Sequence, residues 1–242
     1  MYVTPPFRPS IAKTSYYSSI ESSGHAPTLR DIQEVISRTH RPLGYNDARD
    51  GMFQLVFDTD GDDSVADIYT GRIIRGIGGY KDAFSAGMNT EHTWPQSLGA
   101  TGIGRSDLHQ LMPSDSKVNS RRGNMPYGEV VTEYWHGGEI VTSRQGLDSS
   151  GHEVFEPPNR MKGDIARALL YFYTRYNHTG LSRFSTTNFA IELPFLLKWH
   201  VMDPVDATEM DRNDAVYSIQ GNRNPFIDNP DWVNTLDFSG KI

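Results

Sequence analysis

The chain of 242 residues contains no cysteine. That absence excludes a disulfide framework, a metal site built from thiolates and a cysteine nucleophile. Long hydrophobic runs are absent too: the longest, residues 168–173 and 193–197, fall far short of the roughly 20 apolar residues that cross a bilayer. No membrane-spanning helix and no membrane partner are therefore expected. A hydrophobic content of 37% is typical of a water-soluble globular protein, and the length suffices to bury a sizeable core.

The beginning of the chain lacks the continuous apolar stretch of a secretory signal peptide. Residues 1–20 carry prolines and serines where such a stretch would lie. Either the protein is not exported or its export signal is missing from this sequence.

Positive charge is in short supply, with 23 Lys and Arg residues against 30 Asp and Glu residues and a net charge of −7. This balance argues mildly against a protein whose whole surface binds nucleic acid. Two segments carry the opposite sign. Residues 160–183 hold five basic residues and one acidic residue, and residues 105–122 hold four basic residues and two acidic ones. The sequence therefore predicts a basic face on an acidic body, which is compatible with a polyanionic substrate.

The order of elements along the chain predicts one domain. Residues 1–27 are rich in Ser, Pro and Tyr without a clear period and are expected to form an irregular arm. A first helix should begin at Thr28, with Asp31 completing a capping pair, and residues 64–75 have the alternation of a strand. Further expected elements are an amphipathic stretch at 46–57, an acidic loop at 58–63, a helix at 114–121 capped by Ser114 or Asp115, a β-hairpin over 129–143 that turns at Gly137 and Gly138, and helices at 161–176, 192–202 (with Pro194 in its first turn) and 206–219. No repeat or linker interrupts this order, so residues 28–242 are expected to form a single domain.

The segment from residue 88 to residue 124 carries the chemistry. Hydrolysis of a phosphodiester needs a base for water, neutralisation of the phosphate oxygens and stabilisation of the departing alkoxide. His92 is the natural base, because an unperturbed imidazole is substantially neutral at pH 7. Glu91 and Asn119 supply hard oxygen ligands of the kind that suits Mg²⁺. The metal would carry the charge on the phosphate and on the departing oxygen.

Spacing raises one difficulty for this assignment. Glu91 and His92 would point to opposite faces of a regular strand. Residues 93–95, Thr-Trp-Pro, end the strand at once and permit an irregular backbone there. Asn119 falls in the expected helix, so its carboxamide can project from a rigid element toward the strand.

Several ordered blocks resemble one protein family. They are Asn-Thr-Glu-His-Thr-Trp-Pro over 89–95, Asp-Leu-His over 107–109, Asn-Ser-Arg-Arg-Gly-Asn over 119–124, Phe-Glu-Pro-Pro over 155–158, Lys-Gly-Asp-Ile-Ala-Arg over 162–167 and Gln-Gly-Asn-Arg-Asn-Pro-Phe-Ile-Asp over 220–228. Together they look like the endonuclease I family of secreted and periplasmic non-specific nucleases, and the resemblance covers roughly residues 28–238. It implies an α+β fold in which a ββα-metal (His-Me) finger core is embedded in a mainly helical single domain with a small antiparallel sheet.

The resemblance also implies roles for individual residues. His92 would be the general base, and Glu91 and Asn119 would bind a single Mg²⁺, for which Mn²⁺ or Ca²⁺ could substitute. The products would be 5′-phosphate ends of DNA, and of RNA as well, with little sequence preference. Members commonly hold the phosphate with an arginine between the two halves of the motif. Arg105 is the only arginine between His92 and Asn119, and Arg122 is the second choice.

The resemblance implies an extracellular or periplasmic location. A monomer is expected, because nothing in the sequence indicates an obligate oligomer.

Other polar residues have two interpretations each. Asp107 and His109 either orient His92 or the waters on the metal, or hold the finger strand to the helix. Arg167 either contacts the nucleic-acid backbone or is solvated on the surface. The segment 220–228 is expected to form a structural cap whose side chains bind loop backbone.

The acidic loop at 58–63 has the alternating aspartates of a calcium loop. Gly61 is in the wrong place for an EF-hand, and Tyr69 stands where its glutamate would be. A solvated turn is therefore favoured over a calcium site.

Two rival functions remain. One is a member of the same family that prefers RNA, although no residue visibly reads a 2′-hydroxyl group. The other is a catalytically silent nucleic-acid-binding module, which should have lost Glu91, His92 or Asn119, and all three are present. A zinc hydrolase is disfavoured, because there is no His-Glu-x-x-His pair and the histidines lack ligand spacing.

Overall fold

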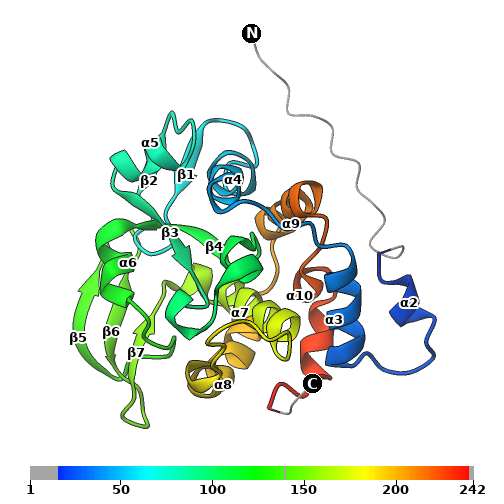
Figure 1. Ribbon diagram of the computed structural model, residues 1–242. Coiled ribbons are helices and arrows are strands. Elements are labelled where there is room, and N and C mark those ends of the chain that lie inside the picture. The colour runs from blue at the N-terminus through cyan, green and yellow to red at the C-terminus, as the bar shows by residue number, and fades with distance from the viewer. Residues whose placement is uncertain (1–15, 139, 240–242) are drawn as a thin grey trace.

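The computed structural model describes residues 16–138 and 140–239, which adopt an α+β fold (Figure 1). The strands form small antiparallel sheets. They are β1 (Ser64–Ala66) with β2 (Ile73–Arg75), β3 (Met88–His92) with β4 (Leu111–Asp115), and a three-stranded sheet of β5 (Thr132–Gly137), β6 (Ser143–Leu147) and β7 (Glu153–Glu156). The helices are α2 (Ser18–Glu21), α3 (Leu29–Arg38), α4 (Tyr45–Gly51), α5 (Tyr80–Ser85), α6 (Ser116–Arg122), α7 (Lys162–Tyr176), α8 (Thr187–Met202), α9 (Ala207–Gln220) and α10 (Pro225–Asp228). Shorter helical turns are η1 (Met52–Val56), η2 (Gln96–Leu98), η3 (Gly102–Ser106), η4 (Asn159–Met161) and η5 (Pro230–Asn234). The predicted α+β class, mainly helical with small antiparallel sheets, is confirmed.

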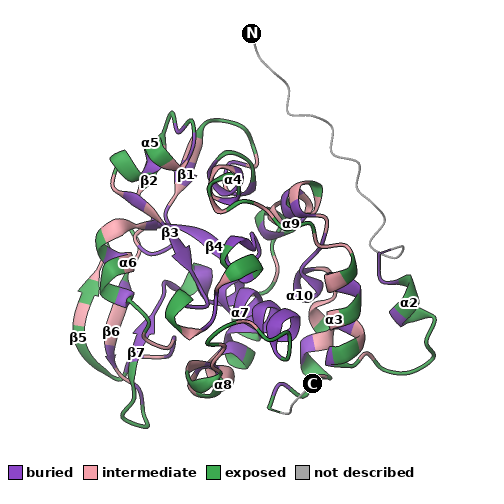
Figure 2. Cartoon of the chain, viewed as in Figure 1, coloured by how far each residue is buried: buried purple, intermediate pink, exposed green. Residues whose placement is uncertain are grey.

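Helix α7 forms the centre of the molecule, and each of its 15 residues is buried (Figure 2). α8 packs along it, and α3 and α10 contact it as well. A helix that is buried on every side must be apolar or have its charges paired. Lys162 accordingly forms an ion pair with Glu156 at 2.6 Å, and Arg167 forms one with Glu209 at 2.6 Å. The basic face predicted over 160–183 is therefore wrong for Lys162 and Arg167, whose charges are neutralised inside the fold.

An aromatic cluster fixes the chain just after β3. The indole of Trp94 lies 5.1 Å from the ring of Phe172, 5.0 Å from that of Phe184 and 5.7 Å from that of Phe189, measured between centroids. Phe172 belongs to α7 and Phe189 to α8. The end of β3 is thus anchored to the central helices.

Strands β3 and β4 and helix α6 form one continuous unit. The two strands pair antiparallel, with His92 opposite Leu111 and Met88 opposite Asp115. Asp115 then caps α6, because its side chain accepts hydrogen bonds from the amides of Lys117 and Val118. Asp115 is one of the two predicted caps, and this prediction is confirmed. The helix α6 that it starts lies against both β3 and β4.

Other predicted helix ends are confirmed by their caps. At α3, Thr28 and Asp31 form a reciprocal capping box. At α9, Asp206 accepts from the amide of Glu209, and Gly221 ends the helix in the left-handed conformation. The amphipathic stretch at 46–57 corresponds to α4 and η1.

The strand predicted over 64–75 is wrong, because the segment folds into the hairpin of β1 and β2. The side chain of Asp67 forms the turn by accepting hydrogen bonds from the amides of Tyr69 (2.9 Å), Thr70 (3.1 Å) and Arg72 (3.1 Å). Gly71 follows with a φ of 73°. An aspartate whose side chain binds the backbone amides of the residues that follow it favours a turn over a continuous strand.

Two further predictions need correction. The hairpin after residue 129 pairs Gly137 with Ser143, so Gly137 ends β5 instead of forming the predicted turn with Gly138, and β7 adds a strand that was not predicted. α8 begins at Thr187, which places Pro194 inside the helix instead of in its first turn. Helix packing against α7 outweighs the local cost of the proline.

The N-terminal arm predicted over 1–27 lies partly outside the described residues. From residue 16 onward, Tyr16 and Tyr17 are buried, and α2 follows them. Within the described ranges, no helix has the length and apolar character needed to cross a membrane.

Candidate active site

A pocket of about 320 Å³ opens beside β3 and α6. Glu91 and His92 line it from β3, Asn119 lines it from α6, and Tyr45 lines it from α4. The structure thus brings the predicted base and both predicted metal ligands into one pocket. This follows from the chain path, since α6 returns directly to the strand that carries Glu91 and His92.

His92 has a defined proton arrangement. Its Nε2 atom lies 3.0 Å from the carbonyl oxygen of Arg105, and because a carbonyl only accepts, Nε2 donates and Nδ1 keeps its lone pair. The amide nitrogen of Gln96 makes a long contact of 3.5 Å with Nδ1. Burial, together with the nearby arginines, lowers the pKa of His92 to about 4. The imidazole is therefore neutral at pH 7 and able to accept a proton at Nδ1.

Asn119 is held so that its oxygen is left for the pocket. Its amide nitrogen donates to the carbonyl of Thr90 at 3.3 Å and to the hydroxyl of Ser114 at 3.0 Å. Both bonds use the nitrogen, which leaves Oδ1 as the polar atom available to a cation. Ser114 precedes the cap of α6, so the same turn that starts the helix also orients this side chain.

Glu91 is buried and paired with Arg122. Arg122 Nη1 donates to Glu91 Oε1 at 2.7 Å, and the hydroxyl of Tyr127 donates to the same oxygen at 3.3 Å. Burial raises the pKa of Glu91 to about 6, and the adjacent guanidinium opposes that rise. One carboxylate oxygen donor and one amide oxygen donor in the same pocket fit a hard divalent cation that keeps several waters.

Arg122 also holds the end of β3. Its guanidinium donates to the carbonyls of His92 at 3.1 Å and Thr93 at 2.9 Å, and it is 1% exposed. The arginine therefore fixes the end of β3, the strand from which both Glu91 and His92 reach the pocket. It is engaged with protein acceptors, which distinguishes it from Arg105.

Arg105 lies exposed at the edge of the site. Its guanidinium carbon stands 3.8 Å from the ring centroid of Tyr45, and the Tyr45 centroid is 5.7 Å from that of His92. The side chain of Arg105 is thus stacked on a residue that lines the pocket, while its carbonyl binds the imidazole.

Asp107 and His109 connect the site to the C-terminal segment. Asp107 accepts hydrogen bonds from the hydroxyls of Tyr171 and Tyr176, each at 2.8 Å, and from Gln220 Nε2 at 2.8 Å. Gln220 Oε1 accepts from the amide of Leu108 at 2.8 Å, and His109 Nε2 lies 3.1 Å from the carbonyl of Asn222. These contacts favour the interpretation that Asp107 and His109 hold the unit of β3, β4 and α6 to the helices. They also agree with the structural role expected for residues 220–228.

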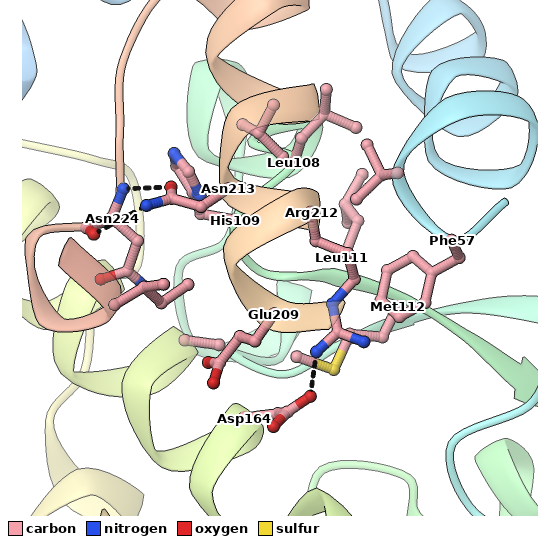
Figure 3. Close-up of a pocket in the computed structure, with 14 residues that line it drawn as sticks. Phe57, Leu108, His109, Leu111, Met112, Asp164, Glu209, Arg212, Asn213 and Asn224 are labelled. Carbon is pink, nitrogen blue, oxygen red and sulfur yellow. Dashed lines mark hydrogen bonds and ion pairs between the residues drawn. The ribbon is translucent and has the colours of Figure 1, made fainter. Parts of the chain in front are cut away.

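Arg167 lies away from the pocket. It is fully buried, and it donates to both carboxylate oxygens of Glu209, at 2.7 and 2.6 Å. Figure 3 shows the neighbouring cavity of about 40 Å³, where Arg212 of α9 donates to Asp164 of α7 and where Glu209 also lies. This polar cluster joins α7 to α9 behind β4 and is not part of the site.

The acidic loop forms a turn that gathers three carboxylates. Oxygens of Asp58, Asp60 and Asp62 lie within 4.8 Å of one another. Burial and the neighbouring Asp60 raise the pKa of Asp58. Exposed acidic groups often gather in this way without a metal, so the solvated turn stays the favoured interpretation.

Three residues beside the site had no sequence signal. Tyr45 and Arg49 come from α4, far before the motif, and Tyr127 follows it. The hydroxyl of Tyr127 lies 2.6 Å from that of Tyr69 and also reaches Glu91. Each is recruited by tertiary packing between segments that are far apart in the chain.

Comparison with known proteins agrees with the resemblance of the motifs. The model of the family described as Endonuclease I matches residues 30–231. An extracellular ribonuclease of Bacillus amyloliquefaciens is 33% identical over 94% of this chain and 80% of that protein, and one of Bacillus subtilis (strain 168) is 30% identical over 96% and 81%. An extracellular deoxyribonuclease of Aeromonas hydrophila is 30% identical over 50% of this chain and 49% of its own length. The chain therefore belongs to the endonuclease I family and is an endonuclease, a hydrolase of phosphodiester bonds.

Proposed function

We propose that this endonuclease cleaves DNA and RNA with little sequence preference, using one Mg²⁺ and His92 as general base. The observation that carries the proposal is the common pocket of Glu91, His92 and Asn119. Glu91 and Asn119 would hold the metal, which when bound supplies positive charge to the phosphate and the departing oxygen. Mn²⁺ or Ca²⁺ would fit the same oxygen donors.

The residues of the chain divide the remaining work. His92 Nδ1 takes a proton from water, and the water oxygen attacks phosphorus in line with the 3′ oxygen. The bond from phosphorus to the 3′ oxygen breaks, which leaves a 5′-phosphate and a 3′-hydroxyl protonated by solvent. The carbonyl of Arg105 holds the imidazole in the tautomer that keeps Nδ1 free. The exposed guanidinium of Arg105 would hold the phosphate beside the pocket.

Digestion of supercoiled plasmid and of a structured RNA, with Mg²⁺ and with EDTA, tests the proposal. His92→Ala should lose roughly 10²- to 10⁴-fold in rate. His152→Ala is the matched control, because His152 is exposed and bonds to Asp148 on a distant turn. Cleavage by His92→Ala at the wild-type rate would overturn the assignment of the base.

Metal binding is tested separately from activity. Mn²⁺ titration followed by electron paramagnetic resonance should show one site that weakens at least tenfold in Asn119→Ala. Asp60→Asn serves as the control for the acidic turn and should leave that site unchanged. Retention of the site by Asn119→Ala, with its loss in Asp60→Asn, would move the metal to the turn.

Two relatives favour RNA as a principal substrate. The two Bacillus proteins that align with nearly the whole chain are named ribonucleases, whereas the protein named a deoxyribonuclease aligns with half of it. Comparison of kcat/KM on RNA and on DNA of matched length and sequence decides between a balanced nuclease and an RNA-preferring one.

Location and assembly complete the proposal. Several relatives carry the word extracellular or periplasmic in their names, and we propose that this protein acts outside the cytoplasm as a monomer. Cell fractionation and light scattering on the purified protein check these two points.

A further inference from the structure

Four side chains beside the active site follow one another in contact. Arg49 of α4 lies with its guanidinium carbon 3.6 Å from the ring centroid of Tyr80 and 4.5 Å from that of Tyr45. Arg105 lies 3.8 Å from the same Tyr45 centroid. Tyr80 begins α5, and Arg105 belongs to η3. We call Tyr80, Arg49, Tyr45 and Arg105 the arginine–tyrosine ladder.

The two arginines of the ladder carry charge that the fold does not neutralise. Among the described residues, Arg49 and Arg105 form no ion pair, whereas Arg122 and Arg167 each have a buried carboxylate partner. Arg49 instead donates to Asn46 Oδ1 at 2.6 Å, and its buried Nε has no hydrogen-bond partner within the described chain.

Acidic residues on the same helix are directed elsewhere. Asp50 accepts from the amide of Tyr80 at 2.9 Å. A carboxylate oxygen of Asp47 packs against Gly44, 2.6 Å from where a Cβ would stand on that glycine. Neither carboxylate forms an ion pair with Arg49 in the described structure.

Two like charges so placed repel each other. Both guanidinium carbons lie near one ring, at 4.5 and 3.8 Å from its centroid, so at most about 8 Å separates them, roughly one Debye length at physiological salt. At that distance salt screens their mutual repulsion only in part. Phosphates bound at the two guanidinium groups would relieve this repulsion, and the cation–π contacts preorganise the planar groups for them.

The ladder starts at the wall of the catalytic pocket. Tyr45 lines the pocket, and its ring centroid is 5.7 Å from that of His92. The carbonyl of Arg105 binds the same imidazole. From this point the ladder extends along α4 to Tyr80 at the start of α5. A nucleic-acid strand that leaves the pocket could follow this path.

We propose that the arginine–tyrosine ladder binds the backbone of the nucleic-acid strand next to the scissile bond, with Arg49 holding the phosphodiester that neighbours the one at Arg105. This rests on the proposed function. Tyr45 is the positioning residue, because its ring supports both guanidiniums. Contacts of this kind add affinity without reading sequence, which suits a nuclease of little sequence preference.

The salt dependence of binding tests the ladder. The probe is a fluorescein-labelled single-stranded DNA of 20 nucleotides, and the protein carries His92→Ala and is kept in EDTA so that no cleavage occurs. Each phosphate contact contributes about 0.7 to the slope of log K against log salt for a single strand. Arg49→Gln should lower the slope by about that amount and weaken binding about tenfold at moderate salt. Lys81→Gln, which removes an exposed cation from α5 outside the ladder, should change neither.

Further variants separate position from charge and guard against misfolding. Arg49→Lys should keep the slope, and Tyr45→Phe should behave as the parent, whereas Tyr45→Leu should lose part of the slope. Arg105→Gln, whose side chain is exposed, should also lower the slope by about 0.7, and thermal melts identify any variant that is unfolded.

A slope in Arg49→Gln equal to that in Lys81→Gln would overturn the proposal. So would an unchanged slope in Arg105→Gln if Arg49→Gln fails to fold. These outcomes leave the nuclease assignment standing, because that depends on metal-dependent cleavage and its loss in the His92 variant.

Discussion

Replacement of Arg122 by methionine should lower the stability of the fold, by way of Glu91. Arg122 is 1% exposed and donates to Glu91 Oε1, to the carbonyl of His92 and to the carbonyl of Thr93. Removal of one partner from a buried ion pair leaves an uncompensated charge, which costs about 3–5 kcal/mol. Arg122→Met should therefore lose about this much unfolding free energy at pH 8, as measured by urea denaturation.

The same substitution has a predictable pH dependence. Burial already raises the pKa of Glu91 from 4.5 to about 6, while Arg122 opposes the rise, so without the arginine the pKa of Glu91 climbs further. A carboxyl whose folded-state pKa is raised contributes stability below its unfolded pKa and loses it as the pH rises through the folded value. At pH 5 the variant carries a neutral Glu91, and its deficit should shrink to the lost hydrogen bonds, about 1–3 kcal/mol.

The matched control is the neighbouring arginine on the same helix. Arg121 is exposed and donates to Gln145 at 2.6 Å, so Arg121→Met should change the unfolding free energy by about 0.5 kcal/mol or less. Glu91→Gln combined with Arg122→Met should recover part of the loss at pH 8, because the buried charge is gone. Equal deficits for Arg122→Met at pH 5 and pH 8, or a deficit no larger than that of Arg121→Met, would refute the reasoning.

Three further predictions concern pH and anchoring. Because burial lowers the pKa of His92 to about 4, kcat/KM at saturating metal should stay level from pH 8 down to about pH 5. A fall of kcat/KM centred near pH 6.5 would contradict a neutral, desolvated base. Burial raises the pKa of Glu192 from 4.5 to about 7, so the neutral carboxyl stabilises the fold in acid and this stability is lost as the pH rises through 7. Glu192→Gln should therefore raise the Tm at pH 8, by the equivalent of up to about 3 kcal/mol. At pH 5 the same circular-dichroism melts should show little change. Burial raises the pKa of Asp107, but His40, His109 and the hydrogen bonds to its carboxylate outweigh burial and hold the pKa below its usual value. The carboxylate therefore stabilises the fold above that usual pKa, and this stabilisation disappears in acid; Asp107→Asn should lower the free energy of unfolding in urea by about 2–4 kcal/mol at pH 7. Its kcat per folded molecule should stay within about twofold of wild type, and a tenfold loss of kcat in a folded variant would instead tie Asp107 to the chemistry.

The local part of the site could be predicted from sequence because its pieces are close in the chain. Glu91 and His92 end one strand, and Asp115 caps the helix that carries Asn119 back to it. Hydrophobic pattern and cap chemistry are properties of neighbouring residues, so they can be recognised without knowledge of the fold.

What escaped prediction depends on distant partners. The charge of Arg167 reads as a surface feature until Glu209 is placed beside it. Likewise, no pattern shows that Tyr45 and Arg49 of α4 lie next to Arg105. The strand predicted at 64–75 failed for a different, local reason: the side chain of Asp67 binds the amides of Tyr69 and Arg72, which a strand would offer to its neighbour.

The hold of the C-terminal segment on residues 107–109 has a consequence for the order of synthesis. The ribosome completes Glu91, His92 and Asn119 well before Gln220 and Asn222, which bind the turn that precedes β4. A nascent or truncated chain that ends before residue 220 carries the reactive side chains without the contacts that align them. We therefore expect the nuclease to become fully active only after residues 220–222 have folded onto residues 107–109.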